Sequence, residues 1–117
     1  MRFVIAIPLV LLAGAALAQD VPEETAKDLW CGIAFGIISS DAPVDVTAEQ
    51  QGIIDAYRAG GDELVGRAKT AHMERGFTEE SFAGRVASLT IDVTAQVNAT
   101  DNSAPYTFEA CSALIGL

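Results

Sequence analysis

The sequence predicts an all-α protein: a small four-helix bundle stapled by one disulfide and preceded by a signal peptide. Apolar residues recur at the spacing of helix faces. Three clusters of turn-forming residues separate four apolar segments. Two cysteines, Cys31 and Cys111, stand near the two ends of this region. With no repeat or internal linker in the chain, we expect a single helical domain over residues 19 to 117.

Residues 1 to 18 have the composition of a cleavable bacterial signal peptide. One basic residue is followed by an apolar stretch over residues 3 to 12, and Ala16-Leu17-Ala18 matches the small-x-small cleavage pattern. We expect cleavage between Ala18 and Gln19. The alternative is a retained membrane anchor, but the apolar stretch is shorter than the roughly 20 residues that a spanning helix needs. The expected location is therefore the periplasm or the exterior, with no stable membrane anchor.

Charge excludes several classes of partner. Cleavage would remove one base and no acid, leaving 99 residues with 6 basic and 16 acidic side chains and a net charge of −10. Such a charge repels nucleic acids and anionic lipid surfaces. It is compatible with a basic protein partner, although a surplus of acids is also typical of ordinary solubility.

An even number of cysteines in a short exported chain indicates a disulfide. Only one intramolecular pair exists, Cys31 with Cys111, and it joins residues 80 positions apart. In the loop-entropy description, closing a loop of that length contributes about 4 to 5 kcal/mol. We expect the bond to be structural.

The first two helices have recognisable starts. Asp20 and Glu23 are spaced as a capping box with Pro22 in the first turn, and residues 29 to 38 are all apolar or Gly. We therefore expect this helix at the centre of the bundle.

Thr47 and Gln50 form a second capping box, and Gly76 ends the helix that follows. One helical phase runs straight through Gly60-Gly61, which favours one helix over two, with local kinking at the glycines left open. The apolar residues in this phase are Ile53, Ile54, Tyr57, Leu64, Val65 and Ala68.

The third helix begins at Thr78, with Phe77 and Phe82 at the two positions of a hydrophobic staple. Residues 89 to 97 alternate like a strand and also fit a helix. We predict helix, because a lone strand would have no partner in this chain.

A short closing helix follows Thr107, with Phe108, Cys111 and Ile115 on one face. The disulfide would hold this helix, which is too short to be stable alone, against the first one.

No residue is predicted to be catalytic, to bind a cofactor or to bind a metal ion. His72 is the sole histidine, and we expect it to be a solvated residue near a helix end. The cysteines are expected to be oxidised to each other rather than to serve as nucleophiles. Five carboxylates could supply an acid/base pair, but we expect them to act at caps and turns. They are Glu23, Glu24, Asp28, Asp41 and Asp45.

Small residues four apart, Gly32, Gly36 and Ser40, form a strip on the first helix. We expect another backbone to pack closely there inside the bundle.

The layout of the chain, with a Trp30-Cys31-Gly32 start and a Phe108-Glu109-Ala110-Cys111 finish, resembles small two-cysteine helical periplasmic proteins of Gram-negative bacteria, most of them uncharacterised. In length and in its one cysteine pair it also looks distantly like the HdeA acid-stress chaperone family. The cysteines lie farther apart here than in that family. No binding residue is carried over.

We expect a non-enzymatic exported protein that binds a partner or protects other proteins under stress. Acidification would neutralise the acids and loosen the bundle through charge reversal. The alternative is a secreted, inhibitor-like module for a basic partner, and a small-molecule enzyme comes third.

Mass spectrometry of the exported protein tests the signal peptide and the disulfide together. We expect a chain that starts at Gln19 and gains the mass of two hydrogens on reduction. A chain that retains residues 1 to 18, or a mass unchanged by reductant, would contradict one of the two expectations.

Overall fold

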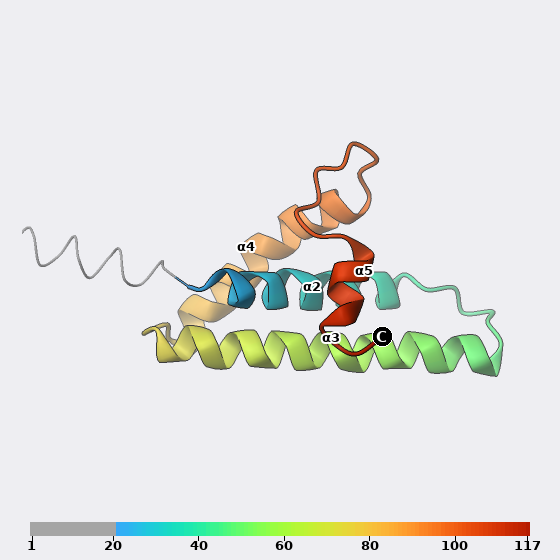
Figure 1. Ribbon diagram of the computed structural model, residues 1–117, viewed down its shortest axis with the longest axis horizontal. Coiled ribbons are helices and arrows are strands. Elements are labelled where there is room, and N and C mark those ends of the chain that lie inside the picture. Colours follow the sequence, from blue (N-terminus) through green and yellow to red (C-terminus); the bar gives the residue numbers. More distant parts are fainter. Residues whose placement is uncertain (1–20) are drawn as a thin grey trace, which may run out of the picture.

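The computed structural model describes residues 21–117. The predicted signal peptide and Asp20 lie outside the described residues. Within them the chain forms four helices and no strand (Figure 1), namely α2 (Glu23–Ser40), α3 (Ala48–Glu74), α4 (Glu79–Val97) and α5 (Phe108–Ala113). The all-α prediction is confirmed, and residues 89 to 97 are helical.

The helices are arranged around α2. Helices α2 and α3 lie side by side and antiparallel, α4 crosses the pair obliquely, and α5 runs back toward the pair (Figure 1). Helix α2 packs against each of the other three. Its buried residues are consecutive from Leu29 to Phe35, so it is buried on all sides along this stretch, as its apolar sequence predicts.

The predicted caps are confirmed for three helices. The Thr47 hydroxyl accepts the Gln50 amide N–H at 3.1 Å and the Gln50 side chain accepts the Thr47 amide N–H at 2.9 Å. Thr78 caps α4 in the same way, with Ser81 as its partner. Thr107 caps α5 by accepting the Ala110 amide N–H.

The start of α2 differs from the prediction. Pro22 is the N-cap rather than part of the first turn, and it makes no side-chain hydrogen bond to the helix. Its ψ of 152° keeps it extended, so the helix begins at Glu23.

Glycines allow α2 and α3 to approach closely. A Cβ on Gly32 would lie 2.8 Å from Val65 Cγ2 and 2.9 Å from the Gly61 carbonyl oxygen. A Cβ on Gly61 would in turn lie 3.0 Å from the Gly32 carbonyl oxygen. Helix α3 runs unbroken through this point, which confirms the continuous-helix interpretation and shows what the paired glycines do. Of the predicted strip, Gly32 makes the tight contact, whereas a Cβ on Gly36 would meet nothing within 4 Å.

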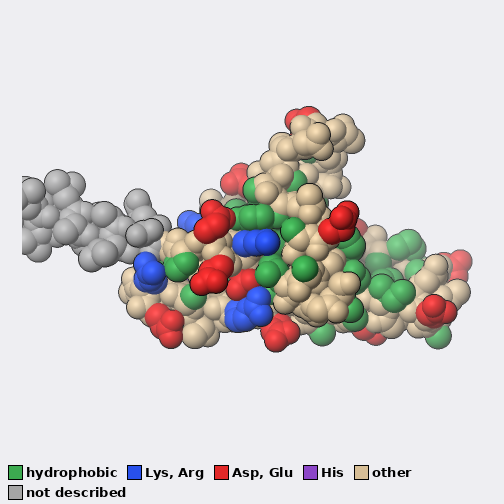
Figure 2. All heavy atoms as spheres, in the orientation of Figure 1, with side chains coloured by type: hydrophobic (Ala, Val, Ile, Leu, Met, Phe, Trp, Pro, Cys, Tyr) green, Lys and Arg blue, Asp and Glu red, His purple; other side chains and the backbone are tan. Residues whose placement is uncertain are grey.

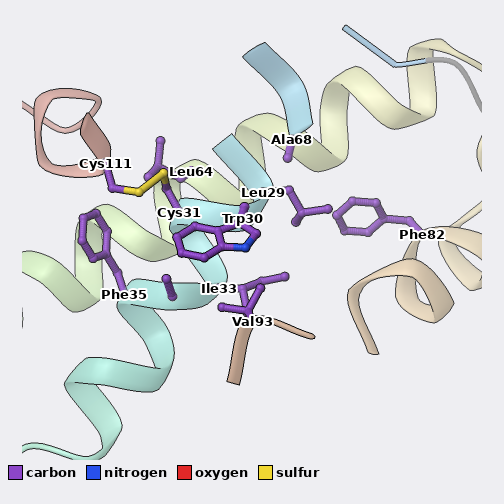
Figure 3. Packing of buried hydrophobic residues seen from close by; sticks show 11 residues of the cluster. Leu29, Trp30, Cys31, Ile33, Phe35, Leu64, Ala68, Phe82, Val93 and Cys111 are labelled. Atoms are coloured by element: carbon purple, nitrogen blue, oxygen red, sulfur yellow. A yellow bond between two sulfur atoms is a disulfide. The ribbon is translucent and has the colours of Figure 1, made fainter. Parts of the chain in front are cut away.

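The disulfide lies beside this contact. Cys31 and Cys111 are joined by an S–S bond of 2.05 Å with their Cα atoms 5.3 Å apart, and both side chains are buried (Figure 3). The bond fastens α5 to α2, as predicted. Ile115, just beyond α5, occupies the space that a side chain at Gly60 would need, since a Cβ there would lie 2.5 Å from Ile115 Cδ1.

His72 is buried, so the prediction of a solvated histidine is wrong. Its exposed fraction is 0%, and its ring lies edge-on to Phe77 and Phe82, with centroids 4.7 and 5.1 Å away. Nδ1 lies 2.7 Å from the Ala68 carbonyl oxygen, while Nε2 has no hydrogen-bond partner. The physical reason is that the chain reverses at Gly76 and folds the two staple phenylalanines over the last turn of α3. The two phenyl rings thus exclude solvent from His72 at this helix end.

The glycine contact can be tested with two matched substitutions. We expect Gly32→Ala to lower the free energy of unfolding by about 1 to 3 kcal/mol, because backbone atoms of α3 cannot move aside for the new methyl group. Gly66→Ala should raise it by about 0.5 to 1 kcal/mol, since Gly66 lies within α3 and a Cβ there meets open space. Urea unfolding of the oxidised proteins measures both values. Equal effects of the two substitutions would contradict the close approach.

Candidate functional site

An apolar groove of about 630 Å³ opens between the C-terminal part of α2, the 41–47 connection and the N-terminal half of α3. We call it the α2–α3 groove. Three of its apolar side chains are prominently exposed: Ile38 (44%), Ile53 (53%) and Phe108 (53%). In Figure 2 hydrophobic side chains gather at this end of the molecule. The groove is lined by Phe35, Ile37, Ile38, Ser39, Asp41, Ala42, Pro43, Val46, Gln50, Ile53, Ile54, Tyr57, Val97, Asn98 and Phe108.

The groove exists because the apolar stripe on α3 is longer than the surface that covers it. Helix α3 has 27 residues and α2 has 18, about 40 Å against 27 Å at 1.5 Å per residue. The apolar phase predicted for this helix includes Ile53, Ile54 and Tyr57, and none of these three is fully buried. The second half of the stripe, around Leu64 and Ala68, is buried as expected.

Three aromatic rings form one wall of the groove. Phe35 of α2 lies edge-on to Tyr57 of α3 at a centroid distance of 5.0 Å and to Phe108 of α5 at 5.9 Å. Tyr57 and Phe108 are 5.3 Å apart. The hydroxyl groups of Tyr57 and Ser112 are 3.3 Å apart, within hydrogen-bond distance. Contacts between rings from three helices thus form this wall without a ligand.

A second hollow of about 500 Å³ adjoins the groove, between α2, the end of α4 and the 98–107 connection. Several of its polar lining groups already have partners. Gln96 accepts the Trp30 indole N–H at 2.8 Å, and the Thr107 hydroxyl caps α5. The two hollows share the lining residues Phe35, Ile38, Val97 and Phe108.

Tyr106 anchors the 98–107 connection to α2. Its ring lies edge-on to Trp30 at 5.7 Å, and its hydroxyl donates a short hydrogen bond to the Glu23 carboxylate. Desolvation raises the pKa of Tyr106 to about 12, and the hydrogen bond and the negative charge of Glu23 act in the same direction.

Three acidic residues lie on the segments that line the α2–α3 groove. Asp41 lines it, Asp45 directly precedes the lining residue Val46, and Glu49 directly precedes Gln50. We call these three residues the acidic rim. All three are exposed, and none forms an ion pair with another described residue. The rim faces solvent beside an apolar surface.

The other carboxylates singled out in the sequence are not brought together as an acid/base pair. Asp28 accepts two hydrogen bonds from Arg67, at 2.9 and 3.2 Å. The hydrogen bonding to Asp28 is the largest cause of the raised pKa of Arg67. Glu23 binds Tyr106, and Glu24 lies in the first turn of α2.

Cys31 and Cys111 are joined in the disulfide and carry no thiol in this state. Among the described residues no group of three or more histidine, cysteine or acidic side chains is placed to hold a metal ion. No helix within residues 21–117 is long and apolar enough to cross a membrane.

The sequence predicts a central position for the groove residues of α2 up to Ile38, and it predicts the apolar phase of α3 but not the groove. The signal that could have revealed the groove is the mismatch in length between the second predicted helix and its neighbours. The 41–46 segment is a further sign of an open apolar surface. It places Val44 and Val46 beside acidic residues and a proline, and apolar residues in such a turn seldom face a core.

The chain matches no protein-family model, no curated protein and no solved structure.

Titration of Tyr106 tests the anchoring of the 98–107 connection. In a Tyr57→Phe background, where Tyr106 is the remaining tyrosine, phenolate absorbance should rise with a midpoint near pH 12 rather than 10. Since the pKa is higher in the folded state, this contribution to stability is complete below pH 10 and is lost as pH rises to about 12. Adding Glu23→Gln should lower the midpoint. A midpoint at 10 in the folded protein would contradict the contact.

Proposed function

We propose that this protein is an exported, periplasmic, non-enzymatic binding protein that holds an apolar segment of another protein in the α2–α3 groove, in a stress-protective role. The observation that carries the proposal is the groove itself. It has a volume of about 630 Å³, a mainly apolar lining and an aromatic wall. A volume of this size lies within the range of roughly 300 to 1,000 Å³ that is typical of binding sites. Covering its exposed apolar side chains removes them from water, which favours binding.

The disulfide supports the placement in an oxidising compartment, because such bonds form and persist there. The composition of the groove supports binding rather than catalysis. A catalytic site brings several polar groups to bear on one reacting atom. In the adjoining hollow, by contrast, Gln96 binds Trp30 and Thr107 caps α5.

Acidification supplies a way to enlarge the binding surface. Lys69 lies 2.5 Å from Glu79 across the turn between α3 and α4, and its hydrogen bond and positive charge hold the pKa of Glu79 below its ordinary value of 4.5. Because this pKa is lowered in the folded state, the stability it adds is present above pH 4.5 and is lost as pH falls further. Protonation also removes most of the negative charge and leaves the bases in excess, which loosens the packing of α4.

The alternative is an inhibitor-like module for a basic partner, which the acidic rim favours. It uses the same surface and differs in what occupies it. A small-molecule enzyme is the weakest of the three, since neither hollow combines a buried nucleophile with a base.

Aggregation assays test the proposed function. We expect the oxidised protein to suppress aggregation of a partly unfolded client protein, more strongly at acid than at neutral pH. Ile53→Ser should reduce suppression at neutral pH several-fold, because Ile53 lines the groove and is 53% exposed.

The matched control is Ile91→Ser, which removes a more exposed isoleucine, 73%, from the surface of α4 outside the groove. It should leave suppression unchanged. Absence of suppression at both pH values would refute the stress-protective role, and equal losses in the two variants would refute the groove as its site.

A further inference from the structure

We propose that the occupant of the α2–α3 groove is a cationic amphipathic segment of a protein, whose apolar face fills the groove while its Lys or Arg side chains meet the acidic rim. This inference rests on the proposed function and adds the chemical class of the partner. It is carried by the distribution of charge around the groove, which differs from the rest of the molecule.

Cations are nearly absent from the groove end of the chain. Residues 35–58 and 97–109, which contain every lining residue of the groove, include six acids and one base. The remaining described residues include nine acids and five bases. In Figure 2 the visible Lys and Arg side chains lie away from the end where the hydrophobic side chains gather.

The single base at this end does not neutralise the acidic rim. Arg58 donates a hydrogen bond at 3.1 Å to the carbonyl oxygen of Ser39, and its guanidinium lies 3.4 Å from Asp55. It is thus engaged with the end of α2 and with a carboxylate of its own helix. Asp41, Asp45 and Glu49 form no ion pair with a cation among the described residues.

One of the two helix C-termini at the groove strengthens its negative potential. Helices α2 and α4 both end at the groove, since Ser39 and Asp41 from one and Val97 and Asn98 from the other line it. Neither helix has a basic residue in its last turn. The unbonded carbonyl groups at a helix C-terminus carry about half a negative charge. Arg58 already donates to the Ser39 carbonyl at the end of α2, so the C-terminus of α4 is the one that a cation from a partner would neutralise. The opposite dipole at the start of α3 is already offset by Glu49 in its first turn.

Charge also decides between occupants. A second copy of this chain would bring a second acidic rim to the same place, and like charges opposed across an interface cost affinity. An anionic lipid surface is repelled for the same reason. A segment with an apolar face and flanking cations satisfies the groove and the rim together.

Synthetic peptides provide the test with the full disulfide-bonded protein. The probe is an 18-residue amphipathic peptide of Leu and Lys. One control peptide replaces every Lys by Glu, and another keeps the Leu and Lys composition in a scrambled order without an apolar face. We expect the first peptide to bind, with an affinity that falls as salt increases. Both controls should bind at least tenfold more weakly in isothermal calorimetry.

Variants assign the effect to the rim and to the groove. Asp41→Asn/Asp45→Asn/Glu49→Gln should weaken binding of the Leu/Lys peptide about tenfold at low salt, since each exposed charge pair contributes a few-fold. Glu24→Gln/Glu74→Gln/Glu80→Gln changes the net charge equally at the opposite end and should change affinity less than twofold. Ile53→Ser should weaken binding while Ile91→Ser does not. Circular dichroism confirms that each variant is folded.

The outcomes separate this inference from the proposed function. If the Leu/Glu peptide binds as well as the Leu/Lys peptide and Ile53→Ser weakens both, the groove binds apolar segments but the cationic partner is refuted. If the two acid-neutralising triple variants have equal effects, the role of the rim is refuted. If no peptide with an apolar face binds, both the inference and the proposed function fail.

Discussion

The backbones of α2 and α3 touch at Gly32 and Gly61, and the rest of the structure is arranged about that contact. Residues on either side of it join the third partner: Cys31 is bonded to α5, and Gly60 leaves room for Ile115. Three segments far apart in the sequence therefore meet where side chains are smallest. Close approach brings the flanking large side chains, such as Leu29 and Leu64, into full burial.

The same contact explains why one end of the molecule is filled and the other is open. From Gly61 onward α3 packs against α2 and α4, and the turn beyond it closes over His72. Before Gly60, α3 continues along the end of α2 without a third helix over it, because α4 diverges and α5 is only 6 residues long (Figure 1). The aromatic wall of Phe35, Tyr57 and Phe108 marks the boundary between the two parts. The groove is a consequence of helix lengths and not of a local distortion.

Local signals predicted the helices well. Thr47, Thr78 and Thr107 act within one turn of their own position, so their capping role can be read from neighbouring residues alone. The disulfide was also predictable, since two cysteines allow one pairing. Burial could not be predicted in the same way, because it depends on which element arrives from elsewhere in the chain. His72 is buried by phenylalanines that follow the turn, whereas Ile53 is exposed because no other element of the described residues packs over it. A helical stripe identifies an apolar face but does not say whether that face is occupied by the protein or left for a partner.

The bond between Cys31 and Cys111 also determines what a protease can do to this molecule. It closes a covalent ring that contains α3, α4 and both connections beside the groove, residues 41–47 and 98–107. A single cleavage in either connection opens the ring but releases no fragment, because the two pieces remain joined through sulfur. A nicked molecule would keep all four helices tethered, and the new ends would lie next to the groove. Cleavage of one peptide bond in either connection thus gives a two-chain protein that differs from the intact one only by the water added at the cut.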